Sequence, residues 1–275
     1  MKKTFLLILL PLVGLNFNSF AQGDLIISPS RVVFDGKKQT EELNLVNNGK
    51  DTAIYTISFV QKVMKEDGSF ENIEKPDSGQ KFADSYLRVF PRTIKLAPGE
   101  PQVIKIQYDR RKDMMAGEYR SHLYFRAEKN NTPIGLDKAA VDPTKLIVQL
   151  EPVYGITIPV IIRSGIVTAT STISNVKMLN LQDTIQNLHF IINRVGNASL
   201  FGDIEIEFTP KLGKPYSVGE MNGVGVYTNI NKRIMVVKLN NKSGKKLQNG
   251  KLKVQYISRK DNKQVILSQS EIEIN

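Results

Sequence analysis

The chain of 275 residues contains no cysteine and no tryptophan, and it has only two histidines. The lack of cysteine excludes disulfides, thiolate metal ligands and thiol nucleophiles, and it also excludes a lipid anchor on cysteine. The fold must therefore be stabilised by the burial of its apolar side chains.

Catalytic and metal-binding motifs are also missing. His122 and His189 each stand alone in a strand-like segment, whereas zinc sites use three or four nitrogen or sulfur ligands at recognisable spacings. The sequence has no G-x-S-x-G, no P-loop and no G-x-G-x-x-G, and the G-x-G in MNGVGVY (221–227) is followed by no helical pattern. We therefore predict structural histidines and a protein that is not an enzyme, with no metal and no cofactor.

The first 22 residues, MKKTFLLILLPLVGLNFNSFAQ, are typical of a secretory signal peptide. Two lysines precede an apolar run from Phe5 to Leu15, and Ser19 and Ala21 have the spacing of a cleavage site. A retained membrane anchor is the alternative, but this run is shorter than the roughly 20 residues that cross a bilayer. We predict that residues 1–22 direct export and are cleaved near Ala21.

The chain is basic, with 38 Lys and Arg against 27 Asp and Glu, a net charge of +11. Removing Lys2 and Lys3 with the signal peptide leaves 36 basic residues against 27, or +9. This excess suits an acidic partner, a membrane surface or nucleic acid. Export argues against nucleic acid, and the short basic clusters lack interleaved aromatic residues. A solvated basic surface is the simplest interpretation.

Short runs of alternating apolar and polar residues recur along the chain, and no stretch has a helical period over ten or more residues. The first series consists of segments 25–34, 40–48, 52–63, 101–109 and 119–128. The second series consists of segments 166–176, 187–195, 202–210, 233–240, 250–258 and 264–274. The chain is therefore predicted to be all-β.

The two series predict two domains. Each contains about six or seven short strands, as in an immunoglobulin-like β-sandwich, and a Ser-Gly pair at 164–165 separates them. We predict an N-terminal domain over 23–163 and a C-terminal domain over 164–275. A single large β-barrel is the alternative.

Segment 119–128 shows the alternation that a two-faced strand requires. Tyr119, Leu123 and Phe125 are expected to face the core. The opposite face, which carries Arg120, His122, Tyr124 and Arg126, is expected to face solvent.

A longer stripe follows in PTKLIVQLEPVYGITIPVIIR (143–163), directly after a long polar loop over 128–145. The even positions from 146 to 162 form it: Leu146, Val148, Leu150, Pro152, Tyr154, Ile156, Ile158, Val160 and Ile162. Most such stripes lie in the protein's own core.

Three segments together resemble the N-terminal domain of the PapD-like periplasmic pilus chaperones. They are ISPSRVVFDG (27–36), VFPRTIKLAPGEPQVIKIQYD (89–109) and GEYRSHLYFRAE (117–128), followed by the long loop and the stripe. The second half is similar to the C-terminal domain of that family in NRVGN (193–197), in 226–241 and in GKLKVQY (250–256). The resemblance covers nearly all of the chain after the signal peptide.

The resemblance implies two immunoglobulin-like domains set at an angle, with a cleft that holds the end of an incomplete subunit. Chaperones of the family complete the subunit's sandwich by lending it their seventh strand, which is a known form of strand addition. Applied here, it makes Leu146, Val148 and Leu150 the donor residues. The later positions, from Tyr154 through Ile156 and Ile158, would serve the chaperone's own core.

The resemblance also implies an anchor for the subunit's C-terminal carboxylate. Arg31 matches the cleft arginine of the family, and a guanidinium offers a rigid, permanently charged fork of donors. The family's second anchor is a lysine, where this chain has Thr157. Arg31 could act with Thr157 as a neutral donor, Arg163 could reach in, or the partner could be held in another way.

The resemblance implies a location in the periplasm, a pilin-like or other β-sandwich subunit as partner, and contact with the membrane only by way of a partner. An outer-membrane usher is the receiver in the family. The alternative function is a two-domain immunoglobulin-like structural or secretion-complex component of the cell envelope. A carbohydrate-binding sandwich is disfavoured by the lack of tryptophan.

Overall fold

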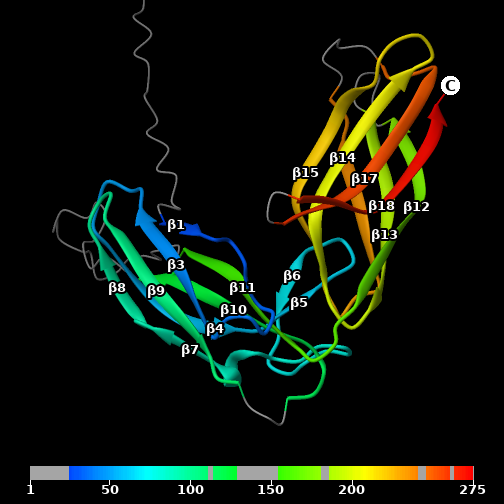
Figure 1. The fold of residues 1–275 in the computed structure, drawn as a ribbon. Helices are drawn as coiled ribbons and strands as arrows, with labels where there is room; N and C mark the ends of the chain where they lie inside the picture. The colour runs from blue at the N-terminus through cyan, green and yellow to red at the C-terminus, as the bar shows by residue number, and fades with distance from the viewer. Residues whose placement is uncertain are drawn as a thin grey trace, which may run out of the picture.

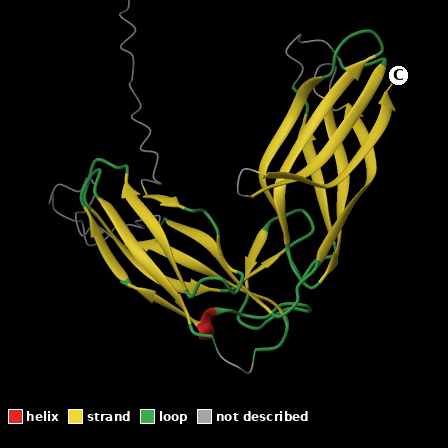
Figure 2. Ribbon diagram, viewed as in Figure 1, coloured by secondary structure: helices red, strands yellow, loops and turns green. Residues whose placement is uncertain are grey.

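The computed structural model describes residues 25–110, 114–128, 154–180, 186–240, 246–260 and 263–274. Strands account for almost all of its regular structure, with one short 3-10 turn, η1 (Asp84–Tyr86), in the described part. The strands form two β-sandwiches that lie at an angle to each other (Figures 1 and 2). The predicted fold class is thereby confirmed. Residues 1–22, predicted as the signal peptide, lie outside the described residues.

Two sheets face each other in the first sandwich, with strand orders β1-β3-β9-β7 and β2-β11-β10-β4-β8. Alternate apolar side chains of both sheets form one buried cluster, as the sequence pattern requires. The strands are β1 (Leu25–Ser28), β2 (Val32–Phe34), β3 (Thr40–Asn47), β4 (Ala53–Val60), β7 (Leu87–Phe90), β8 (Thr93–Leu96), β9 (Pro101–Tyr108), β10 (Gly117–Ala127) and β11 (Gly155–Ser164).

Segment 25–34, predicted as one strand, forms two. β1 pairs with β3 in one sheet, and β2 pairs in parallel with β11 in the other. The chain therefore crosses from sheet to sheet between Ser28 and Val32, and Arg31 lies at this crossing. A residue at such a crossing is free of the strand alternation, so its side chain can point to the end of the sandwich.

One half of the stripe belongs to the first sandwich's own core. Ile158, Val160 and Ile162 on β11 are at most 4% exposed, and Ile156 packs against them. Tyr154 does not continue the buried row, since it is 43% exposed. The predicted donor residues Leu146, Val148 and Leu150 lie outside the described residues.

The first half of the opposite face of β10 is buried, contrary to the expectation, whereas Tyr124 is half-buried and Arg126 is exposed. Arg120 and His122 are only 6% and 3% exposed, and Glu118 on the same face is 3% exposed. Their partners come from the second sandwich, which covers this end of β10. A polar face of a strand can be buried when a second domain supplies its hydrogen bonds.

The second sandwich has sheets with strand orders β12-β13-β16 and β15-β14-β17-β18. Its core follows the predicted alternation, for example at Ile204, Ile206 and Phe208 on β14. β15 was not predicted, because its glycines weaken the apolar pattern. The strands are β12 (Ala169–Asn180), β13 (Gln186–Gly196), β14 (Leu200–Pro210), β15 (Tyr216–Val226), β16 (Lys232–Lys238), β17 (Gly250–Lys260) and β18 (Lys263–Ile274).

A small hairpin, β5 (Lys62–Met64) and β6 (Phe70–Asn72), extends from the first sandwich to the second (Figure 1). The side chain of Met64 is 3% exposed and belongs to the core cluster of the second sandwich. The carbonyl of Glu66 accepts a hydrogen bond from the amide of Ile234 on β16, at 2.7 Å. The hairpin thus attaches one sandwich to the edge strand of the other.

Candidate functional site

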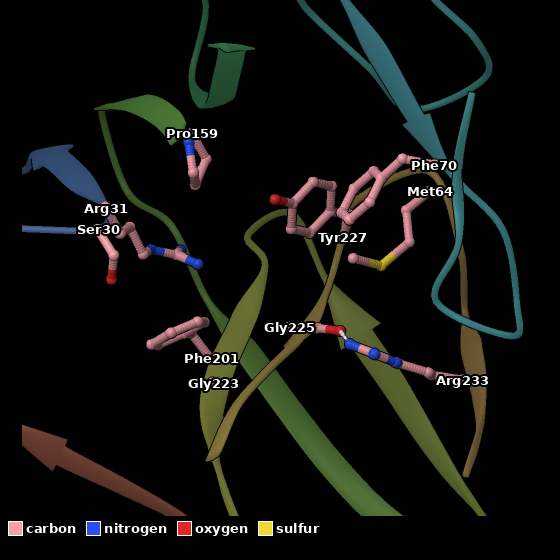
Figure 3. Close-up of a pocket in the computed structure, with 10 residues that line it drawn as sticks. All are labelled: Ser30, Arg31, Met64, Phe70, Pro159, Phe201, Gly223, Gly225, Tyr227 and Arg233. Atoms are coloured by element: carbon pink, nitrogen blue, oxygen red, sulfur yellow. Dashed lines mark hydrogen bonds between the residues drawn. The ribbon is translucent and has the colours of Figure 1, made fainter. Parts of the chain in front are cut away.

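A pocket of about 260 Å³ lies between the two sandwiches (Figure 3). Its walls combine aromatic and apolar side chains with two arginines, and none of the described residues that line it is acidic. The first sandwich and its hairpin contribute Ser30, Arg31, Met64, Phe70 and Pro159, and the second contributes Phe201, Gly223, Gly225, Tyr227 and Arg233.

Arg31 points from the sheet crossing into this pocket (Figure 3). Its Nη2 donates to the hydroxyl of Ser199 at 3.2 Å, and its guanidinium carbon lies 4.5 Å from the centre of the Phe201 ring. Burial, together with the nearby Arg120, lowers the pKa of Arg31 to about 10. Arg31 stays charged at neutral pH, and among the described residues it forms no ion pair with a carboxylate.

Glu118 is the buried acid nearest to this group. Arg120 donates to one of its oxygens, and the Nε of Arg163 donates to the other at 3.3 Å. The second oxygen also accepts from the amide and hydroxyl of Ser199, at 2.9 and 2.8 Å. Burial raises the pKa of Glu118, but Arg120, the Ser199 amide and Arg163 outweigh it and hold the pKa below its ordinary value. Glu118 is therefore a charged carboxylate whose acceptor sites are already in use.

Tyr227 forms an aromatic wall against the charged face of β10. The guanidinium carbon of Arg120 lies 3.2 Å from the centre of the Tyr227 ring, and His122 stacks on the same ring. Phe70 of the hairpin contacts both Tyr227 and His122. Burial lowers the pKa of His122 to about 3, with contributions from Arg120 and Lys62. The imidazole is therefore neutral, and its environment is aromatic and cationic.

Arg194 positions the loops of the second sandwich that line the pocket. It is 4% exposed, and its guanidinium donates to the carbonyls of Gly196, Ala198, Thr228 and Ile230. These carbonyls come from the loop before β14 and the loop after β15. Because one buried guanidinium ties both loops, it also fixes the neighbouring Ser199, Phe201 and Tyr227.

Of the two predicted anchor residues, only Arg31 lines the pocket. Thr157 lies opposite Tyr124 in the β10–β11 ladder, two residues before Pro159, which does line it. The alternative cation, Arg163, is engaged with Glu118 and with the carbonyl of Ser199, the latter at 3.1 Å. The anchor role of Arg31 and Thr157 stays a prediction.

The start of β11 presents a strand edge. The amide of Ala127 on β10 donates to the carbonyl of Tyr154 at 3.0 Å, so in an antiparallel ladder the hydrogen-bonding groups of Gly155 and Thr157 point away from β10. On that outer side β2 pairs with β11 only from residue 160 to 162 among the described strands. Pro159 fits this arrangement because its missing N–H would also point outward.

The described ranges contain no cluster of three or more His, Asp or Glu side chains that could hold a metal ion. Among the same residues, no helix has the length and apolar character to cross a membrane.

Sequence reasoning missed most of the site. Glu118, Ser199, Tyr227 and Arg233 carry no motif, and Arg120 and His122 were expected in solvent. The sequence gives one indication of this site, because alternation places a glutamate, an arginine and a histidine next to one another on one face of β10. Only the placement of the second sandwich gives them partners.

No protein-family model matches the chain, and no curated protein matches it. Solved structures with a similar fold include the YadV chaperone, at 12% identity with a TM-score of 0.44, over 92% of this chain and 100% of that one. Another is the CsuC–CsuE chaperone and tip-adhesion-subunit complex from Csu pili of Acinetobacter baumannii, at 13% identity with a TM-score of 0.45, over 91% and 99% of the two chains. A third is the CupB2 chaperone of Pseudomonas aeruginosa, at 11% identity with a TM-score of 0.43, over 91% and 100%.

Proposed function

We propose that this protein is a periplasmic chaperone that binds an incomplete β-sandwich subunit and delivers it for assembly at the cell surface. Arg31 anchors the C-terminal carboxylate of the subunit. Leu146, Val148 and Leu150 fill the subunit's open groove by donor-strand complementation. The chain carries out no covalent chemistry, and an outer-membrane usher receives the complex.

One observation carries this proposal: Arg31 points into a pocket between the sandwiches and has no acidic partner among the described residues. A charged guanidinium removed from water loses hydration that a single hydroxyl and an aromatic ring do not replace. A carboxylate would supply two acceptors in the geometry that a guanidinium fork prefers. The pocket is therefore suited to an anionic chain end.

The open edge of β11 supports the second part of the proposal. The outward groups of Gly155 and Thr157 lie only a few residues after the predicted donor segment on the same chain. A subunit strand could pair along this edge while its terminus approaches Arg31. Burial of three donor side chains would add about 5 to 9 kcal/mol before the costs of association.

The decisive experiment is capture from the periplasm. We expect the tagged mature protein to co-purify with a small β-rich subunit, identified by mass spectrometry. Arg31→Ala should reduce the subunit yield at least tenfold with little change in thermal stability. Arg88→Ala is the matched control, because Arg88 is exposed on β7 and should leave the yield unchanged.

Two outcomes would contradict the proposal. An unchanged subunit yield with Arg31→Ala would remove the anchor role. A protein that stays with the envelope fraction and brings no subunit would favour the structural alternative.

A further inference from the structure

The pocket contains a second arginine, Arg233 on β16, which comes from the other sandwich. Figure 3 shows Arg31 and Arg233 entering the pocket from opposite sides. Within the part of the chain that the structure describes, no acidic side chain lines the space between them. Two fixed positive charges therefore face one small, largely apolar cavity.

The donors of Arg233 are only partly used. Its Nη1 donates to the carbonyl of Gly225, whereas its buried Nε has no acceptor among the described residues. Arg233 is half-buried and forms no ion pair with those residues, and desolvation lowers its pKa although Asp67 acts in the opposite direction. A buried N–H without an acceptor is costly unless something else supplies one.

The neighbouring arginines are bonded to a carboxylate or to several carbonyls of the protein, although the buried Nε of Arg120, like that of Arg233, has no acceptor among the described residues. Arg120 and Arg163 share the carboxylate of Glu118, and Arg194 is bonded to backbone carbonyls of its own domain. Arg31 and Arg233 thus remain as the cations of the pocket that form no ion pair within the described residues, one from each sandwich, although Glu118 and Asp67 lie near enough to act on their charges.

We propose that Arg31 holds the C-terminal carboxylate of the partner chain and that Arg233 binds a second anionic group of the same chain. This second group is the side chain of an Asp or Glu residue close to the C-terminus. This inference rests on the proposed function and adds a specificity contact from the second sandwich. An extended chain advances about 3.3 Å per residue, and the pocket is small, so the acidic residue must lie within about four positions of the terminus. The aromatic walls lower the local polarity and so strengthen the attraction between the charges.

The test uses the mature protein and synthetic ten-residue peptides of alternating valine and threonine with a free C-terminus. One glutamate is moved through the last four positions, and each peptide has a glutamine counterpart. At the best position we expect the glutamate peptide to bind about tenfold more tightly than its glutamine counterpart.

Substitutions then assign this preference to a residue. Arg233→Gln should abolish the preference and leave binding of the glutamine peptide nearly unchanged, whereas Arg233→Lys should keep part of it. Arg31→Ala should weaken both peptides equally. Arg88→Gln, on the exposed face of β7, should change neither.

Several outcomes would overturn the inference. Equal binding of glutamate and glutamine peptides to the wild-type protein would do so without any variant, even if Arg233→Gln failed to fold. A preference that survives Arg233→Gln would assign it elsewhere, and an equal loss for both peptides would show a purely structural arginine.

The same peptides distinguish failure of the proposed function from failure of the Arg233 contact. If Arg31→Ala leaves all peptide binding unchanged while the preference still depends on Arg233, the Arg31 anchor is wrong and the Arg233 contact stands. If the wild-type protein binds glutamate and glutamine peptides equally and Arg31→Ala still weakens both, the Arg31 anchor stands and the Arg233 contact is wrong. If none of the peptides binds, both proposals are overturned.

Discussion

Glu118 on β10 accepts hydrogen bonds from both the amide and the hydroxyl of Ser199, which lies just before β14 in the other sandwich. A carboxylate buried between two domains contributes most to stability when every acceptor site on its oxygens receives a hydrogen bond. Arg120 and Arg163 donate to the acceptor sites of Glu118 that Ser199 leaves open. The relative position of the sandwiches therefore depends strongly on one charge.

We expect Glu118→Gln to destabilise the protein by about 3 kcal/mol at pH 7, because Arg120 and Arg163 would lose their shared counter-ion in a buried site. The folded-state pKa of Glu118 is lowered, so its contribution is fully present above the unfolded pKa of about 4.3 and is lost progressively as the pH falls from there through the lower folded-state pKa. Urea unfolding of wild type and variant in steps from pH 7 down to about pH 3 would measure this change.

Glu42→Gln is the control for that experiment. Glu42 is exposed and lies 3.6 Å from Lys105, and exposed ion pairs contribute less than about 1 kcal/mol. A similar loss in both variants would show that the effect is not specific to the buried carboxylate.

His122 predicts a different pH dependence. Its folded-state pKa is lowered to about 3, whereas the unfolded value is about 6.5. Below pH 6.5 the unfolded chain binds a proton that the folded protein excludes, so stability falls as the pH is lowered. Between pH 7 and pH 5 this amounts to about 2 kcal/mol.

His122→Phe should remove that part of the pH dependence and keep the aromatic contacts with Phe70 and Tyr227. The measurement is the difference in unfolding free energy between pH 7 and pH 5 for each protein. Equal differences in wild type and variant would mean that folding does not lower the pKa of His122.

The fold could be predicted from alternation because each sandwich buries one face of each strand. Ile204, Ile206 and Phe208 illustrate this, since a period of two alone places them in the core. The same rule failed on β10, where Arg120 and His122 are as inaccessible as the apolar residues beside them. Alternation of residue types predicts which side chains share a face of the strand, but it does not predict whether a second domain covers the polar face.

The candidate site was predictable only at Arg31, and only through the family resemblance. Arg233 reaches the pocket, and Ser199 reaches Arg31, because the second sandwich is attached by the hairpin and by Glu118. These contacts link residues more than 80 positions apart, and no local pattern encodes them. The hairpin itself is short and polar, so its strands β5 and β6 gave no periodic signal.

The hairpin gives a third prediction. Gly68 at its turn has φ +86°, and an added Cβ would lie 2.4 Å from Nη2 of Arg233. Gly68→Ala should therefore cost about 1 kcal/mol for the left-handed backbone and more for displacing the arginine. We expect weaker attachment of the hairpin, measured as faster proteolysis between the sandwiches.

Gly99→Ala separates the two effects. Gly99 has a similar φ of +73°, but nothing lies within 4 Å of the added Cβ. It should show the backbone cost alone, with unchanged proteolysis between the sandwiches. Equal behaviour of the two variants would mean that Arg233 moves aside without consequence.

The stripe gives the last prediction, because its two halves are assigned to different cores. Val160 is fully buried in the first sandwich, so Val160→Glu places an unpaired charge in a packed core and should prevent folding. Val148→Glu, twelve positions earlier with the same parity, should leave the melting temperature within about 3 °C of wild type, since surface substitutions cost at most about 0.5 kcal/mol.

Only subunit capture should be lost in Val148→Glu, because the charged side chain would then have to enter the partner's groove. Circular dichroism and thermal melting report on folding, and co-purification from the periplasm reports on capture. If Val148→Glu unfolds as Val160→Glu does, residue 148 belongs to the protein's own core and strand donation by this segment is wrong. A folded variant that still captures the subunit at the wild-type level would exclude Val148 from the contact.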